Sequence, residues 1–387
     1  MKEKGLQAET VLKELEAKLS RDFTFTSGKI IGSMCTLPHV LAKQAYIMFL
    51  EKNLGDPGLF PATARLEEEV IQMLGSLLSN PDAAGNIVTG GTEANVLALW
   101  AFKNLKTKNG GEIIVPISSH CSFDKAASLL GFKIVKVGLN DRFQVDVEAV
   151  RRAVNVRTVA IVGIAGTTSL GVVDPIEELS EIALENSLFL HVDAAFGGFV
   201  LPFLKELGYK VLKFDFQLSG VHSVTIDPHK MGLAPIPAGG ILFKNSDLKK
   251  AITWKVPYLA GGEAEQTTFV GTRSGASVIA VWALLKHLGK EGYKKIVKRC
   301  MSLTRKLAEE IRQIHGLDIM IEPTTNIVGI KSNVFDVKRI AGELRKKGWA
   351  VSLFPQHIRI VVMPHIQREH LESFLGDLET IVKKQNG

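Results

Sequence analysis

Short apolar runs alternate with helical patterns between residues 86 and 244, and this alternation limits the possible folds more than any other feature of the chain. Seven runs are typical of strands: NIVTG (86–90), EIIVPI (112–117), KIVKVG (133–138), TVAIVGIAG (158–166), LFLHVDAA (188–195), SVTIDP (223–228) and GGILFK (239–244). Several are hydrophobic at consecutive positions, as strands covered on both faces usually are. The alternation predicts an α/β fold whose mostly parallel, seven-stranded sheet is flanked by helices.

The pattern changes after about residue 275. A long helical pattern, SVIAVWALLKHLG, is followed by a second one at 291–314, two strand-like runs (TNIVGIKS and HIRIVVMP) and a closing amphipathic helix. The 387 residues also exceed the roughly 250–300 residues at which a single core stops growing. We therefore expect an N-terminal helical segment (1–50), a large domain (51–280) and a small C-terminal α+β domain (281–387).

Composition and charge exclude several classes of protein. No apolar run reaches the roughly 18 residues of a membrane span, and the charged opening segment does not have the pattern of a signal peptide. The three cysteines (Cys35, Cys121 and Cys300) have no metal-ligand or paired spacing, so we expect a metal-free protein of the reducing cytoplasm. The net charge of +7 resides in helical patches mixed with Glu, which favours anionic ligands over nucleic acid.

The first strand is followed by TGGTEANVLALW, at the sheet edge where ligands of such folds bind. Its glycines allow a ligand to approach the backbone closely. Thr92 is expected to cap a helix that begins at Glu93 and directs free N–H groups at an anion. The alternative is a tight turn before a capped helix. The motif is neither GxGxxG nor a P-loop, so it favours a phosphate over a dinucleotide.

Other strand ends add polar side chains to the same edge. His120 follows the second strand in SSHCSFDKAA, although a lone histidine is often structural. Asp193 ends the fifth strand and shares a face with Ala195 because side chains alternate along a strand. A buried carboxylate needs a partner, and a structural ion pair is the simpler alternative. The small side chain of Ala195 nevertheless leaves a flat slot beside Asp193.

Lys230 lies in DPHKMG, directly after the strand SVTI, which is an unusual place for a lysine. Pyridoxal phosphate has uses for all these groups: a phosphate, a planar ring, a ring nitrogen and an aldehyde that condenses with a lysine amine. A carboxylate such as Asp193 keeps the ring nitrogen protonated. We expect Lys230, near cationic and apolar groups, to lose its proton readily and to carry the cofactor as a Schiff base.

The motifs TGGTEAN, SSHCSFDKAA, GTTSLGVVDPI, HVDAAFGG and DPHK, in this order, resemble the group II pyridoxal-phosphate decarboxylases of fold-type I. The resemblance runs from roughly residue 30 to the C-terminal strand. The segments GSMCTLPH, FPATARLE and GTRSGAS are similar to the compact archaeal tyrosine/aspartate decarboxylases. The resemblance implies that Lys230 is the Schiff-base lysine, that Asp193 meets the pyridine nitrogen and that His120 stacks on the ring.

The same resemblance implies further cofactor contacts. Gly91, Thr92 and His229 hold the phosphate. Ala195 packs on the ring face opposite His120, and Thr168 supports the surroundings of the ring.

It also implies a homodimer with active sites at the interface, in which the N-terminal segment packs on the partner. Gly271 and Thr272 resemble the stretch that closes over the phosphate from the partner subunit, and Phe60 is expected to enter the neighbouring substrate pocket. Arg359, in HIRIVVMP, matches the arginine that binds the substrate α-carboxylate. His39 is a candidate cation for a second carboxylate on the substrate, although a histidine after proline is often structural.

The expected reaction is decarboxylation of an L-amino acid. We favour L-aspartate, which gives β-alanine for coenzyme A, with L-glutamate as a side activity. The alternative is L-tyrosine, which gives tyramine, with an apolar pocket supplied by Met34, Leu59 and Phe60. Relatives carry a tyrosine on a mobile loop as proton donor. Tyr258 lies before the expected position, so His120 is a competing donor.

Three other classes remain as alternatives. Cysteine desulfurases usually have glutamine where this chain has Phe196, and their nucleophilic cysteine lies on a loop, whereas Cys300 lies in a helical run. A sphingosine-phosphate lyase is expected to have a membrane anchor. A non-catalytic anion-binding module would explain the TGGT motif but not Lys230, Asp193 and His120.

Overall fold

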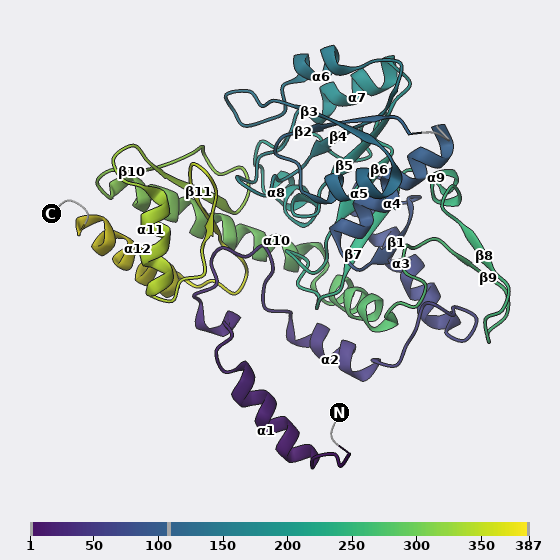
Figure 1. The fold of residues 1–387 in the computed structure, drawn as a ribbon, viewed down its shortest axis with the longest axis horizontal. Coiled ribbons are helices and arrows are strands. Elements are labelled where there is room, and N and C mark those ends of the chain that lie inside the picture. Colours follow the sequence, from purple (N-terminus) through teal and green to yellow (C-terminus); the bar gives the residue numbers. More distant parts are fainter. Residues whose placement is uncertain (1–2, 107–109, 385–387) are drawn as a thin grey trace.

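The computed structural model describes residues 3–106 and 110–384, so the outermost residues of the expected N- and C-terminal segments, 1–2 and 385–387, lie outside it. All seven expected strands are present, and they form one sheet (Figure 1). The strands are β1 (Ala84–Val88), β2 (Glu112–Pro116), β3 (Lys133–Val137), β4 (Thr158–Ile164), β5 (Phe189–Asp193), β6 (Ser223–Ile226) and β7 (Gly239–Phe243). The predicted α/β fold is confirmed.

The sheet has the strand order β1-β7-β6-β5-β4-β2-β3. Only β7 runs antiparallel to its neighbours, and the pairs from β6 to β3 are parallel. Every residue of β4 is buried, which explains the continuous apolar run in its sequence, since helices cover both faces. Because the parallel strands point the same way, the segments that follow β2, β4, β5 and β6 meet at one edge.

The helices of the N-terminal segment and the large domain are short, apart from α3, α4 and α10. They are α1 (Ala8–Leu19), α2 (Val40–Met48), α3 (Pro61–Leu77), α4 (Gly91–Lys106), α5 (Ser122–Leu130), α6 (Val147–Ala153), α7 (Ile176–Glu185), α8 (Leu201–Glu206) and α9 (Ser246–Lys250), with short 3-10 turns at η1 (Phe25–Ser27) and η2 (Gly197–Phe199). A hairpin of β8 (Trp254–Val256) and β9 (Ala264–Gln266) extends from the body of the molecule (Figure 1).

A second sheet lies at the other end of the molecule, beyond α10 (Gly275–Gln313) (Figure 1). It is antiparallel, in the order β10-β11-β13-β12, with strands β10 (Leu317–Ile319), β11 (Ile327–Ser332), β12 (Ser352–Leu353) and β13 (Ile358–Val361). Helices α11 (Val337–Lys346) and α12 (Arg368–Lys383) pack with it around a separate apolar core. The expected boundary at residue 280 lies inside α10, whose helical geometry is interrupted at Gly289. The exact division into segments 1–50, 51–280 and 281–387 stays a prediction.

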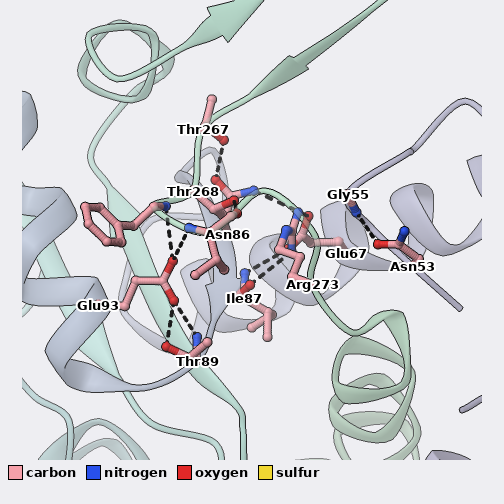
Figure 2. Close-up of polar contacts among 12 residues, drawn as sticks. Asn53, Gly55, Glu67, Asn86, Ile87, Thr89, Glu93, Thr267, Thr268 and Arg273 are labelled. Carbon is pink, nitrogen blue, oxygen red and sulfur yellow. Dashed lines mark hydrogen bonds and ion pairs between the residues drawn. The ribbon is translucent and has the colours of Figure 1, made fainter. Parts of the chain in front are cut away.

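The connection between β9 and α10 is held to the large sheet by buried carboxylates (Figure 2). Arg273 donates to both oxygens of Glu67 in α3, at 2.5 and 2.6 Å. Glu93, in the first turn of α4, accepts from the backbone N–H of Phe269 at 3.1 Å and from the N–H and hydroxyl of Thr89 at 2.8 and 2.7 Å. The segment that contains Gly271 and Thr272 is therefore fixed relative to the start of α4.

Helix α1 projects away from the body of the molecule (Figure 1). None of its residues is buried, and its apolar side chains Leu12 and Leu15 are 61% and 47% exposed. A helix of this length without tertiary packing is marginal in water. None of the helices in the described ranges is both long enough and apolar enough to cross a bilayer.

Candidate active site

A cavity of about 310 Å³ opens at the carboxyl edge of the large sheet. Its lining contains eight of the residues predicted from the sequence: Gly91, Thr92, His120, Thr168, Asp193, Ala195, His229 and Lys230. They come from segments that follow β1, β2, β4, β5 and β6, so the topology of the sheet assembles them from distant parts of the chain.

The loop after β1 lets a ligand approach the backbone at the start of α4. A Cβ atom at Gly91 would lie 2.9 Å from an oxygen of Asp227, and one at Gly90 would lie 3.2 Å from the ring of His229. Glycine therefore keeps this part of the cavity open. The helix begins at Gly91 and not at Glu93, so the expected N-cap role of Thr92 is wrong: Thr92 lies in the first turn. Its backbone remains among the free N–H groups that suit an anion.

Asp193 ends β5 and is 7% exposed. One carboxylate oxygen accepts from the backbone N–H of Ala195 at 3.0 Å. The other accepts from the side-chain amide of Asn95 at 3.0 Å. Both hydrogen-bond partners of this buried carboxylate are thus neutral donors, and Asp193 is not part of an ion pair among the described residues. Because both oxygens are held, the carboxylate faces the cavity in a single orientation.

Lys230 lies in the turn after β6, and its amine is 3.1 Å from Oδ2 of Asp227. The side chain of Lys230 is 20% exposed, whereas that of Asp227 is 2% exposed. Burial lowers the pKa of Lys230, but the negative charges of Asp227 and Asp193 outweigh burial and the pKa is raised. The expectation that Lys230 loses its proton readily is therefore wrong for the unliganded protein, because Asp227 is a counterion three residues earlier.

The two histidines of the site differ in their surroundings. Burial lowers the pKa of His229, against the opposing charge of Asp227 at 3.6 Å. Nδ1 of His229 accepts from the N–H of Ala238 at 3.3 Å. His120 is exposed at the mouth of the cavity, and its Nδ1 accepts from the N–H of Ser122 at 3.2 Å. The other ring nitrogen of His120, Nε2, lies 3.9 Å from the thiol sulfur of Cys121.

A second cavity, of about 440 Å³, adjoins the first and contains Arg359 from β13. Both cavities are lined by Lys230, His120 and Thr168. The guanidinium of Arg359 donates to the carbonyl oxygens of Thr168 at 2.7 Å and Gly32 at 2.5 Å, while its Nε is buried without a partner among the described residues. Burial lowers the pKa of Arg359 to about 10, so the group remains a cation near neutral pH.

The remaining predicted residues lie elsewhere in the described part of the chain. His39 caps α2 by accepting from Leu41 N, and burial together with the nearby His287 lowers its pKa. Neither cavity is lined by His39, Phe60, Gly271 or Thr272.

Phe60, Gly271 and Thr272 lie on or near another part of the surface, beside the loop after α2. Phe60 precedes α3, with the amine of Lys52 5.6 Å from its ring centre. Gly271 and Thr272 pack so tightly on Gly55 that a Cβ there would lie 2.7 Å from Cα of Thr272.

Sequence reasoning missed several residues of the lining. Asp227 is part of the DPHK motif, and a carboxylate three residues before a strand-end lysine was a usable signal for an ion pair. Asn95 lies one turn into α4, where a helical asparagine gives no clear signal. Ser118 lies two residues before His120 in the segment SSHCSFDKAA, from which only His120 was predicted.

The donor set of the cavity fits pyridoxal phosphate. Oδ1 of Asp227 and Oγ of Ser118 are buried and have no hydrogen-bond partner among the described residues, which indicates a polar ligand. The glycine loop and helix start suit a phosphate, and the charge of Asp227 beside them is balanced by the ammonium group of Lys230. Asp193 offers a carboxylate for a ring nitrogen, and Lys230 an amine for an aldehyde.

Sheet order, cavity position and donor set together define an enzyme with the fold-type I architecture of pyridoxal-phosphate enzymes. Residues 50–332 match the family model described as the pyridoxal-dependent decarboxylase conserved domain. The chain belongs to this family. It is a carboxy-lyase, its cofactor is pyridoxal phosphate, and the family predicted from the sequence motifs is confirmed.

Similar proteins cover nearly the whole chain. An "L-aspartate/L-glutamate decarboxylase" from Pyrococcus horikoshii is 53% identical over 98% of this chain and 98% of that protein. A "Probable L-tyrosine/L-aspartate decarboxylase" from Methanothermobacter thermautotrophicus is 52% identical over 92% of this chain and 98% of that protein. The solved structure of a Burkholderia pseudomallei sphingosine-1-phosphate lyase has a TM-score of 0.91 at 30% identity and covers 99% of this chain and 92% of that one.

Proposed function

We propose that this enzyme decarboxylates L-aspartate and releases β-alanine. The observation that carries the proposal is the joint presence of Lys230 and Arg359 in one cavity, an amine and a guanidinium suited to an amino-acid substrate. The printed names of both relatives above include L-aspartate. L-glutamate, which appears in one of these names, is proposed as a side activity.

The proposed roles of the cavity residues follow from their positions. Gly91, Thr92 and His229 hold the phosphate of the cofactor at the start of α4. Asp193 faces the ring nitrogen. Bound pyridoxal phosphate supplies an aldehyde that bonds to a lysine amine, which we assign to Lys230, and a ring that withdraws electrons from the substrate.

Three further residues shape the ring and substrate sites in this proposal. His120 and Ala195 lie on opposite faces of the ring, and Thr168 supports it while fixing Arg359 through its carbonyl group. Arg359 holds the α-carboxylate of the substrate. Backbone carbonyl groups fix the guanidinium of Arg359 in place, so the substrate carboxylate is positioned before it leaves as CO₂.

L-tyrosine is the second candidate substrate, since one relative is named for it. The side chain of Met34 lines both cavities and would suit an aromatic ring. Aspartate instead needs a cation for its β-carboxylate, because an unpaired buried carboxylate is costly. His39 can serve only if it comes from the partner subunit, since it lines neither cavity of its own chain.

Release of CO₂ from single amino acids tests the substrate. We expect the highest kcat/KM for L-aspartate and a much lower value for L-asparagine, which has the same shape but no β-charge. Lys230→Ala is the control that should abolish turnover with every substrate. A kcat/KM for L-tyrosine above that for L-aspartate would overturn the choice of substrate and leave the decarboxylase class intact.

We propose a cytoplasmic setting, in an archaeal cell, in which the β-alanine supplies coenzyme A synthesis. The three cysteines are free thiols, which suits a reducing compartment. Cys300 is buried inside α10, and burial raises its pKa to about 12. A thiol in this position supports the decarboxylase proposal over a desulfurase.

We also propose a homodimer with active sites at the interface. The apolar side of α1 is uncovered, and Ile47 and Met48 at the end of α2 are 72% and 69% exposed. A second copy of the chain would bury these side chains. It would also bring Phe60, Gly271 and Thr272 to the cavity of the neighbouring subunit.

The mass of the protein in solution, measured by light scattering, tests the dimer. Leu12→Asp with Leu15→Asp should weaken it by placing charges on the apolar side of α1. The matched control, Lys13→Asp with Glu14→Asp, changes the net charge equally on the opposite side of the helix and should leave the dimer intact. A monomeric parent protein would contradict the proposal.

A further inference from the structure

A buried network of hydrogen bonds lies beneath Asp193, and Asn95 is its centre. The amide nitrogen of Asn95 donates to Oδ2 of Asp193 at 3.0 Å and to the hydroxyl of Ser122 at 2.9 Å. Its amide oxygen accepts from the hydroxyl of Thr225 at 2.7 Å and lies 3.0 Å from Nε2 of His191. All four hydrogen-bonding positions of the amide are therefore used.

The charge of Asp193 determines which way the amide of Asn95 points. A flipped amide would set its oxygen against the carboxylate, so the nitrogen must face Asp193. Nε2 of His191 then has to donate to the amide oxygen, and Nδ1 accepts from the hydroxyl of Ser223 at 2.7 Å. Burial lowers the pKa of His191 to about 4, which keeps the ring neutral and in this single tautomer near neutral pH.

The network reaches both sides of the proposed ring position. Through Asp193 it holds the carboxylate that faces the ring nitrogen. Through Ser122, whose hydroxyl accepts from Asn95 and whose backbone N–H donates to His120, it holds the turn that carries the stacking histidine. Asn95, His191, Ser122 and Thr225 are all at most 1% exposed, so water cannot replace these bonds.

We propose that Asn95, held in one orientation by His191 and Thr225, is the positioning residue that aligns Asp193 and His120 on the cofactor ring. The inference rests on the proposed contact between Asp193 and the ring nitrogen. An isolated carboxylate at the end of β5 would keep one oxygen free to rotate away. With Asn95 in place, the Asp193 carboxylate is fixed at both oxygens before the cofactor binds.

The test uses protein freed of cofactor and titrated with pyridoxal phosphate, with the Kd read from protein fluorescence. Asn95→Leu keeps the shape of the side chain and should raise the Kd for the cofactor about tenfold, as expected for a lost hydrogen bond to a charged group. Thr225→Val removes one hydrogen bond to the amide oxygen of Asn95 and should raise the Kd for the cofactor about threefold. Both should shift the pH dependence of the absorbance of the Lys230-linked cofactor.

Two controls separate positioning from stability. Thr304 is also fully buried and bonds only within α10, so Thr304→Val should lower the melting temperature without changing the Kd. His191→Gln retains an N–H donor near the position of Nε2 and should restore much of the affinity that His191→Phe loses.

Asp193→Asn, measured in parallel, separates the proposed contact of Asp193 with the ring nitrogen from the proposed positioning role of Asn95. If it weakens the cofactor while Asn95→Leu and Thr225→Val keep the parent Kd and absorbance, the role of Asn95 is overturned and the proposed role of Asp193 stands. If Asp193→Asn itself changes neither the Kd nor the absorbance of the cofactor, the assignment of Asp193 fails, and the inference about Asn95 fails with it.

Discussion

The pairing of Lys230 with Asp227 gives the lysine a different protonation from the one its sequence surroundings predict. The neighbouring histidine and apolar residues favour a neutral amine. The turn after β6, however, places the carboxylate of Asp227 3.1 Å away, and this charge outweighs burial. In the unliganded enzyme Lys230 is therefore an ammonium group, which must lose a proton before it can bond to the cofactor.

Asp227→Asn should therefore speed cofactor loading at neutral pH. Asp227 raises the pKa of Lys230, so its removal lowers that pKa and increases the neutral amine fraction at any given pH below it. The rate at which the absorbance of the Lys230-linked cofactor appears, measured against pH, should shift toward lower pH. A profile that does not move would show that Asp227 does not control the proton of Lys230.

His120 and Tyr258 remain the two candidates for returning a proton to the product carbon. His120 lines both cavities, whereas Tyr258 is 83% exposed in the β8–β9 connection. If His120 is the donor, His120→Phe should keep the stacking surface and cofactor Kd but lower kcat by about 100-fold or more. Tyr258→Phe is the matched variant. A loss of kcat confined to Tyr258→Phe would assign the proton to a tyrosine delivered across the proposed interface.

At the scale of elements, the apolar pattern predicted all seven strands of the large sheet, but neither helix α3 nor four of the shortest strands. Strand β4 carries a continuous apolar run because both of its faces are covered, whereas the edge strand β3 exposes Lys133 and Lys136. Strands β8, β9, β10 and β12 have two or three residues each, which is too short for a period to appear. Helix α10 was expected as two helices, and Gly289 is the place where its regular geometry is broken.

A substitution of Arg273 tests how firmly the segment before α10 is held in place. Its pair with Glu67 is largely buried, with side-chain exposures of 13% and 9% (Figure 2). Arg273→Met leaves the Glu67 carboxylate without its cation, so we expect a loss of about 3 kcal/mol in the free energy of unfolding. Hydrogen exchange of residues 266–273 should also increase.

Arg151→Met is the matched control for this prediction. Its pair with Glu185 lies at the surface, with side-chain exposures of 39% and 57%. The cost there should be about 0–1 kcal/mol, as for exposed ion pairs in general. Equal costs for both variants would show that the Glu67–Arg273 pair does not hold the segment.

At the scale of the whole molecule, the cavity can be compared with the residues predicted from the sequence, whereas the interface stays a prediction. Strand-end motifs are read locally, and the parallel sheet brings them together, so eight predicted residues share one lining. Asn95 was missed because its role depends on partners that only the fold supplies, whereas the partner of Asp227, Lys230, lies three residues away in the DPHK motif and could have been considered from the sequence. Gly271, Thr272 and Phe60 lie away from the cavity of their own chain, and a role for them requires a second chain.

Mixing two inactive variants tests whether the subunits share active sites. One chain carries Lys230→Ala, and the other carries Gly271→Ala with Thr272→Val. A Cβ at Gly271 would meet only the Gln266 side chain, at 3.5 Å, so the second variant should fold normally. In a mixed dimer one site has an intact lysine and an intact segment 271–272 from the other chain. Random mixing of equal amounts should therefore restore about a quarter of the parent activity, since half the dimers are mixed and each has one working site. Activity that stays at the average of the two separate variants would mean that each chain works alone.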